Sequence, residues 1–185
     1  MAKTRPKKSA FEDDPLLHYP DGGRGYEWVA GRITYVAEPD PLHGYFGFRL
    51  GARLVDYVER NDLGLVTGLD AFFLLKREPR VVRGADVAFV AKERLTEPLQ
   101  YGVWVLAPDL VVEVRSRSDR SGKIKAKIAD YMEAGVRLLW VVDPKTKTVA
   151  QYRPGQAEQT FGAEDVLDGE DVLPGFRCAV GTLFR

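Results

Sequence analysis

Residues 84–143 decide the fold, because their pattern predicts a strand, a loop, a strand, a helix and a strand. Their sequence is GADVAFVAKERLTEPLQYGVWVLAPDLVVEVRSRSDRSGKIKAKIADYMEAGVRLLWVVD. In the second strand, DLVVEVR, the alternation of a strand puts Leu110, Val112 and Val114 on one face and Glu113 on the other. A run this rich in valine is typical of a covered sheet, where a carboxylate is costly unless it is paired or binds a metal. Glu113 therefore marks a candidate site.

A second acid lies at the start of the preceding apolar run, residues 85–90. If the two runs form neighbouring strands, Asp86 and Glu113 converge at one point. Two facing carboxylates repel each other and favour a divalent cation with oxygen ligands, typically Mg²⁺ (or Mn²⁺). A cation held there can activate water and stabilise a phosphoryl transition state.

A helix is predicted over residues 119–134, which follow the second strand and end at Gly135. Lys123 and Lys127 lie four residues apart on the flank of its apolar stripe, so either can lean toward the strand ends. A lysine close to the metal can orient the attacking water or offset charge on the phosphate. The sequence therefore places acids and an amine in one region.

An acid on one strand followed by E-x-K on the next resembles the active site of the PD-(D/E)XK nuclease superfamily. PDLVVEVRSRSD, KIADYMEAGV and LLWVVDP are more closely similar to its bacterial branch labelled putative restriction endonuclease, and the similarity runs from about Tyr26 to the final LPGF and LF. In that branch a lysine on the following helix commonly replaces the strand lysine. Here Arg115 occupies the strand position and Lys127 matches the helix lysine. The resemblance implies Asp86 and Glu113 as metal ligands and Lys127 as the catalytic, base-like group.

The resemblance also singles out two residues nearer the N-terminus as accessory site residues. A hairpin is predicted over residues 26–36, and an acid shortly before its glycine is a frequent active-site neighbour in the family, which corresponds to Glu27. The alternative for Glu27 is an edge-strand side chain that faces water. A helix is predicted over residues 43–60, where the family often has a histidine. His43 is then a residue near the phosphate or the partner subunit, or a helix-capping or partly buried histidine.

The predicted fold is α/β, with a restriction-endonuclease-like core, a mixed central sheet flanked by helices, and an N-terminal β-hairpin extension. We expect a disordered basic tail at residues 1–10 and a single nuclease-like domain over residues 11–185, with its core motifs at 84–143. We also expect short strands at 65–67, 71–76 and 148–152 and a loop at 155–169. Tyr101 and Trp104 are an aromatic pair that covers core or, alternatively, stacks on a base. Arg77, Arg80 and Arg83 form a phosphate-contacting cluster or a solvated loop.

Composition limits the class of protein. The 27 basic and 27 acidic residues cancel, which argues against a large non-specific nucleic-acid binder but leaves room for a locally basic cleft. The single cysteine, Cys178, cannot form an internal disulfide and suits a reducing cytoplasm. No apolar run reaches the length of a membrane span, so we expect a cytoplasmic protein without a membrane partner.

Three readings of the acids remain open. The first is a metal-dependent DNA phosphodiesterase, an endonuclease whose cation Asp86 and Glu113 hold, with the water positioned by Lys127 or, alternatively, by Lys123 or Arg115. The second is a catalytically inactive nuclease-like module that binds nucleic acid or assembles with proteins. The third is a structural ion-pair network of the acids with Arg83, Arg115 and Lys127. Under the first reading the partner is DNA, and a homodimer is expected because it reaches both strands.

Overall fold

The computed structural model describes residues 26–35, 41–95, 102–116 and 121–185. The predicted tail at residues 1–10 and the side chain of Tyr101 lie outside these ranges. The description below concerns the described residues alone.

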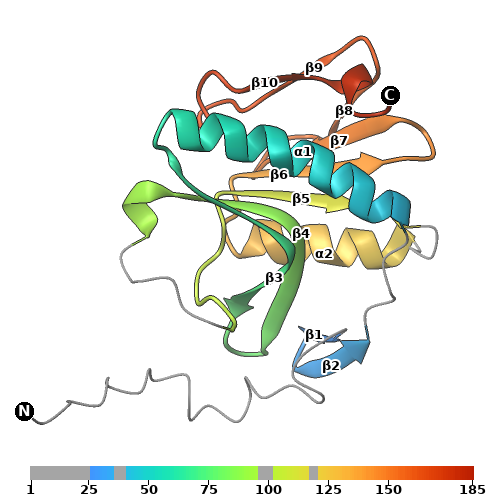
Figure 1. The fold of residues 1–185 in the computed structure, drawn as a ribbon. Coiled ribbons are helices and arrows are strands. Elements are labelled where there is room, and N and C mark those ends of the chain that lie inside the picture. The colour runs from blue at the N-terminus through green and yellow to red at the C-terminus, as the bar shows by residue number, and fades with distance from the viewer. Residues whose placement is uncertain (1–25, 36–40, 96–101, 117–120) are drawn as a thin grey trace, which may run out of the picture.

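One mixed sheet organises the chain (Figure 1). The strands run in the order β2-β1-β4-β5-β6-β7-β8, and β3 pairs with β4 beside this path. The pair β5–β6 is parallel, and its neighbours on both sides are antiparallel. The bounds of the sheet strands are β1 Tyr26–Val29, β2 Arg32–Tyr35, β3 Gly64–Lys76, β4 Val81–Ala91, β5 Leu110–Val114, β6 Leu138–Asp143, β7 Thr148–Tyr152 and β8 Gln159–Phe161.

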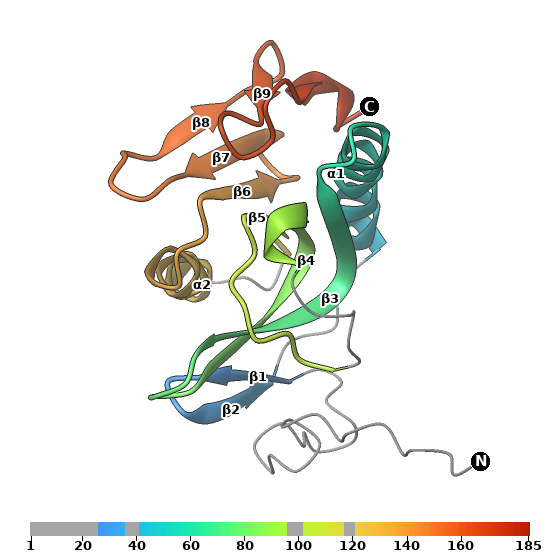
Figure 2. The same ribbon diagram turned by 90° about the vertical axis from the view of Figure 1, so that its left-hand side faces the viewer.

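Two helices cover opposite faces of this sheet (Figure 2). Helix α1, Pro41–Arg60, lies on one face, and helix α2, Ser121–Glu133, lies on the other. The small hairpin of β9, Val166–Asp168, and β10, Arg177–Ala179, packs on the α1 side. Two short 3₁₀ helices, Lys92–Arg94 and Val180–Thr182, complete the described elements. The predicted mixed sheet flanked by helices is confirmed.

The two cores follow from the alternation in β5. Val112 and Val114 join the α1-side core, whereas Val111 joins the α2-side core with Tyr131. Every residue of β5 is buried, as expected for a strand covered on both faces. Because Glu113 has the same parity as Val111, its side chain belongs to the face under α2.

The N-terminal hairpin forms as predicted. It turns at Ala30 and Gly31, whose φ angles of 48° and 77° are those of a tight two-residue turn. The hairpin joins the sheet through Trp28, which pairs with Val82 of β4, and through the amide of Gly31, which donates to the carbonyl of Arg80. This docking brings β1 alongside the start of β4.

Several local expectations need correction. The residues after Gly64 form one continuous strand, β3, instead of two, because a register shift between Gly68 and Ala71 absorbs the irregularity without ending the pairing to β4. The segment 155–169 is not only loop, since it contains β8 and β9, short strands that pair with β7 and β10. Trp104 covers core as predicted, with its ring edge-to-face against Phe73 at 6.0 Å. Among the described helices, none is long and apolar enough to cross a membrane.

Replacing Gly64 by alanine is expected to destabilise the sheet. Gly64 has a φ of +147°, and a Cβ at this position would lie 2.2 Å from the carbonyl oxygen of Val90 and 2.8 Å from the amide nitrogen of Lys92. Because both atoms belong to the backbone, the clash can be relieved only by a shift of the backbone itself. We expect Gly64→Ala to lower the free energy of unfolding by about 3 kcal/mol in urea denaturation.

The matched control is Gly44→Ala, at an exposed position in the first turn of α1, where an added Cβ meets nothing within 4 Å. Alanine is the better helix former, so this variant should gain up to about 1 kcal/mol. Equal effects of the two substitutions would contradict the assignment of Gly64 to a backbone close approach.

Candidate active site

The candidate site lies where β4 and β5 diverge. The two strands pair antiparallel at Val87–Phe89 with Leu110–Val112, so Asp86 stands one residue before the pairing and Glu113 one residue beyond it. A carboxylate oxygen of Asp86 (Oδ2) accepts a hydrogen bond of 2.6 Å from the amide of Val114. The two strands are therefore neighbours, as expected, and the two acids occupy adjoining positions at the fork of the sheet.

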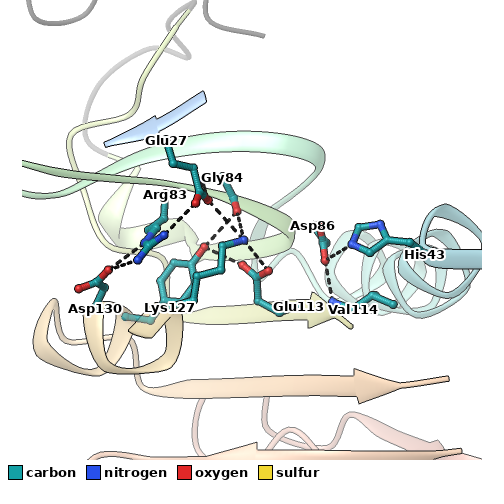
Figure 3. A network of polar contacts seen from close by, with 10 residues as sticks. Glu27, His43, Arg83, Gly84, Asp86, Glu113, Val114, Lys127 and Asp130 are labelled. Atoms are coloured by element: carbon teal, nitrogen blue, oxygen red, sulfur yellow. Dashed lines mark hydrogen bonds and ion pairs between the residues drawn. The ribbon is translucent and has the colours of Figure 1, made fainter. Parts of the chain in front are cut away.

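Helix α2 delivers a cation and a hydroxyl to Glu113. The Lys127 ammonium lies 2.7 Å from Glu113 Oε2, and the Tyr131 hydroxyl donates to Glu113 Oε1 at 2.8 Å. Lys127 also donates to the carbonyl oxygen of Gly84 at 3.0 Å. Because Lys127 and Tyr131 are four residues apart, one turn of helix presents both to a carboxylate that is 3% exposed (Figure 3).

Strand β1 adds a third acid. Glu27 is 5% exposed, and its Oε1 lies 3.3 Å from the Lys127 ammonium and accepts the amide of Gly84 at 3.1 Å. Its other oxygen, Oε2, accepts from Arg83 at 2.8 Å. Arg83 in turn donates to Asp130 of α2 from Nε at 2.8 Å and from Nη2 at 2.5 Å. Glu27 thus faces the site and not water.

Asp86 has a separate partner. His43, in the first turn of α1, places Nε2 3.1 Å from Asp86 Oδ2, and Figure 3 shows Asp86 turned toward His43 while Glu113 turns toward Lys127. The backbone amide of Val114 links the two halves, because it binds Asp86 and follows Glu113 directly. The structure therefore brings Asp86, Glu113, Lys127, Glu27 and His43 into one cluster.

Burial sets the protonation of this cluster. Burial raises the pKa of Glu113 to about 8, against the attraction of Lys127 and with added repulsion from Asp86. Burial opposes the charge of Lys127, but Glu113, Glu27 and Asp86 outweigh it and raise the pKa of the lysine above its usual value. Burial and Glu113 also raise the pKa of Tyr131 well above its usual value. Lys127 is therefore an ammonium and Tyr131 a neutral hydrogen-bond donor at neutral pH.

The acidic side chains of the cluster are of the chemical type that a hard divalent cation prefers. Four ionisable acids, Glu27, Asp86, Glu113 and Asp130, face two permanent cations, Arg83 and Lys127, which leaves two negative charges in excess when all are ionised. Within the described ranges, no three His, Cys, Asp or Glu side chains gather closely enough to hold a metal ion. A protein contribution of two carboxylates suits Mg²⁺, which usually keeps several waters.

The other two accessory candidates lie apart from this cluster. Arg115 pairs with Asp143 at 2.7 Å, and Lys123 is exposed on α2. Of the predicted basic residues, the structure thus brings only Lys127 to Glu113 within the described part of the chain. The third reading named Arg83 and Arg115 as partners of the two acids. Instead, Arg83 binds Glu27 and Asp130.

Two members of the site, Tyr131 and Asp130, are not identified from the sequence. Arg83 is predicted as a member of an ion-pair network, which the structure contains with Glu27 and Asp130 as the acids, and the solvated-loop expectation is wrong because Arg83 is 5% exposed. Tyr131 lies in the apolar stripe of the predicted helix, where its spacing indicates a buried side chain and not a site residue. The four-residue spacing of Lys127 and Tyr131 is a signal that could have identified the hydroxyl.

The fold is that of a nuclease-like protein. The crystal structure of a putative nuclease belonging to DUF820 from Anabaena variabilis ATCC 29413 is similar to this structure with a TM-score of 0.79, at 19% sequence identity, over 92% of this chain and 96% of that chain. The model of the Uma2 family, described as putative restriction endonuclease, matches residues 13–181. The chain belongs to this family, which is part of the PD-(D/E)XK superfamily. No curated protein matches the chain.

Removing the charge of Glu113 is expected to change how stability depends on pH. Below about pH 4.5 its carboxyl is protonated in the folded and unfolded chain alike; as pH rises toward about 8, the unfolded chain loses the proton first and folded stability is lost. Relative to Glu113→Gln, the free energy of unfolding of the metal-free wild type should fall by on the order of 3 kcal/mol between about pH 5 and pH 8.

Urea denaturation at the two pH values, with a chelator present, measures this difference. A purely structural ion pair would give another result, because Glu113→Gln would then be the less stable protein throughout this range.

Proposed function

We propose that the protein is a Mg²⁺-dependent (or Mn²⁺-dependent) endonuclease that hydrolyses phosphodiester bonds of DNA. The observation that carries the proposal is the buried Glu113 at the fork of the sheet, held 2.7 Å from the Lys127 ammonium and beside Asp86 on the neighbouring strand. Membership of a family described as putative restriction endonuclease supports it. Restriction is only one process that such an activity would serve.

Asp86 and Glu113 would hold the cation, with the backbone carbonyl of Val114 as a further oxygen ligand. When bound, such an ion lowers the pKa of water and stabilises charge on the phosphate. Lys127 has a different task from that of a base. Since it keeps its proton, it orients the attacking water or donates to a phosphate oxygen and steadies the developing negative charge.

Tyr131 and Glu27 orient these groups. Tyr131 occupies one oxygen of Glu113, which fixes the rotation of that carboxylate. Glu27 and the carbonyl of Gly84 hold Lys127 from the opposite side. His43 binds Asp86 and so fixes the second acid. These contacts hold the reactive groups before substrate arrives, which is the condition for effective electrostatic catalysis.

The proposal also covers the domain organisation, oligomeric state and location of the protein. We infer one functional domain over residues 11–185 and a homodimer that reaches both DNA strands. Cys178, buried and free, suits a cytoplasmic location.

A second candidate is a nuclease-like module that binds nucleic acid or protein without cleavage. The neutral net charge favours it, as does the separate pairing of Asp86 with His43 and Glu113 with Lys127.

Incubation with DNA tests the proposal directly. Purified protein is mixed with plasmid, linear, single-stranded and branched DNA, with Mg²⁺, with Mn²⁺ or with a chelator. We expect cleavage of at least one substrate that depends on the metal and falls by at least about 100-fold in Asp86→Asn and Glu113→Gln, because each variant removes a charged oxygen ligand.

Lys123→Gln is the matched control, since it removes an exposed α2 lysine and should leave the rate unchanged. Cutting that persists equally in both acid variants would identify a contaminating nuclease. Binding of DNA without any cutting would favour the inactive module.

Metal binding and catalysis are expected to separate at Lys127. Lys127→Gln leaves both carboxylates in place but removes the ammonium beside Glu113, so we expect Mn²⁺ binding to remain while cleavage falls by at least about 100-fold. Titration calorimetry with Mn²⁺ measures the metal affinity, and Asp86→Asn is the control variant in which that affinity should be weakened. If Lys127→Gln abolished metal binding, the assigned division of roles would be wrong.

A further inference from the structure

Arg83 connects the two elements that hold Lys127. It is 5% exposed and lies on β4, where Nη1 donates to Glu27 of β1 at 2.8 Å and Nε donates to Asp130 of α2 at 2.8 Å. Asp130 is three residues from Lys127, on the same face of the helix. Because Lys127 also lies 3.3 Å from Glu27, the four side chains form a closed ring of ion pairs and one helical turn.

The two oxygens of Glu27 have different partners in this ring. Oε2 accepts from Arg83, whereas Oε1 accepts the amide of Gly84 and lies against the Lys127 ammonium. A carboxylate can turn about its last bond unless both ends are held. Arg83 and the Gly84 amide together therefore hold the Glu27 carboxylate with one oxygen against Lys127.

We propose that Arg83 is a positioning residue for Lys127, acting through Glu27 on one side and Asp130 on the other. This inference rests on the proposed nuclease function, in which Lys127 acts on the phosphate or the water. Arg83 itself touches neither. It sets where the ammonium stands relative to Glu113, and a small displacement of such a group carries a large loss of rate.

The role requires an arginine. A guanidinium is a planar fork that reaches two carboxylates from different directions, whereas the lysine ammonium is a single point of charge on a flexible stem. Arg83→Lys keeps the charge of the buried ring but can serve Glu27 or Asp130 and not both with the same geometry. This variant therefore distinguishes the effect of the positive charge from the effect of bridging the two carboxylates.

The hairpin that carries Glu27 has anchors besides Arg83. Trp28 pairs with Val82, the amide of Gly31 donates to the carbonyl of Arg80, and the Arg80 guanidinium lies over the Trp28 ring at 5.8 Å from its centroid. The hairpin therefore keeps its place on β4 when Arg83 changes, and Arg83→Lys is expected to fold.

Steady-state kinetics with the full chain and Mg²⁺ test the proposal on whichever DNA the wild type cuts. We expect Arg83→Lys to lower kcat by at least about tenfold with KM within about twofold, since positioning of Lys127 matters in the transition state and not in binding. In a Lys127→Gln background, Arg83→Lys should cost no further rate, because the residue it positions is gone.

The control for stability is Asp109→Asn. Asp109 is 1% exposed and bonds Arg94 and the amide of Ala91 at the opposite end of β5. Its loss should lower Tm and leave kcat unchanged. A full extra loss of rate from Arg83→Lys in the Lys127→Gln background would overturn the proposal, as would a kcat equal to that of the wild type in Arg83→Lys.

Amine labelling followed by peptide mass analysis tests the same inference without activity. Lys127 should be protected in the wild type and in Asp109→Asn, and should react at least severalfold faster in Arg83→Lys, with exposed Lys123 unchanged as an internal reference. If Lys127 is as well protected in Arg83→Lys as in the wild type, the proposal that Arg83 positions Lys127 is overturned. If the wild type cuts no DNA while Lys127 is released in Arg83→Lys, the proposed function fails and the structural coupling stands.

Discussion

The ion pair between Lys127 and Glu113 is the interaction on which the site depends. It joins α2 to β5 inside the sheet–helix interface, where Glu113 is buried and Lys127 is partly buried, and each satisfies a hydrogen-bonding group of the other. Its 2.7 Å separation requires α2 to lie against the sheet at one height and one rotation, which Tyr131 reinforces from the next turn. Together with the apolar packing of Ile124 and Ile128, this pair sets where α2 lies and so where Asp130 meets Arg83.

The cluster contains more acidic side chains than permanent cations, so ionising the buried Glu113 is costly in the metal-free protein. A network built only for stability would match its charges, as the paired Arg115 and Asp143 do near the ends of β5 and β6. Here burial is the largest cause that raises the pKa of Glu113, and repulsion from Asp86 and Glu27 adds to it against the attraction of Lys127. A divalent cation between carboxylates is the simplest group that would relieve this repulsion.

Local patterns in the sequence were sufficient for the central elements. The alternation around Glu113 and the apolar spacing of α1 and α2 predicted elements that the structure contains, and the two strands expected to be neighbours are paired as β4 and β5. The continuity of β3 was not predictable in this way, because a bulge interrupts the alternation while the hydrogen-bonded ladder continues. Short strands such as β8 and β9 carry too few residues for a period to be recognised.

The sequence by itself determined which residues are buried on which face of each central strand and helix, since side-chain direction follows from the backbone period. It also determined that an acid and a lysine belong to adjoining elements. Only the tertiary structure decided which of several charged groups form ion pairs. Arg83 binds Glu27, and Arg115 binds Asp143 instead of a site residue. Glu27, from a hairpin distant in the sequence, lies against Lys127. The reason is physical. Contacts between elements depend on how strands twist, diverge and dock, and no local period along the chain records that geometry.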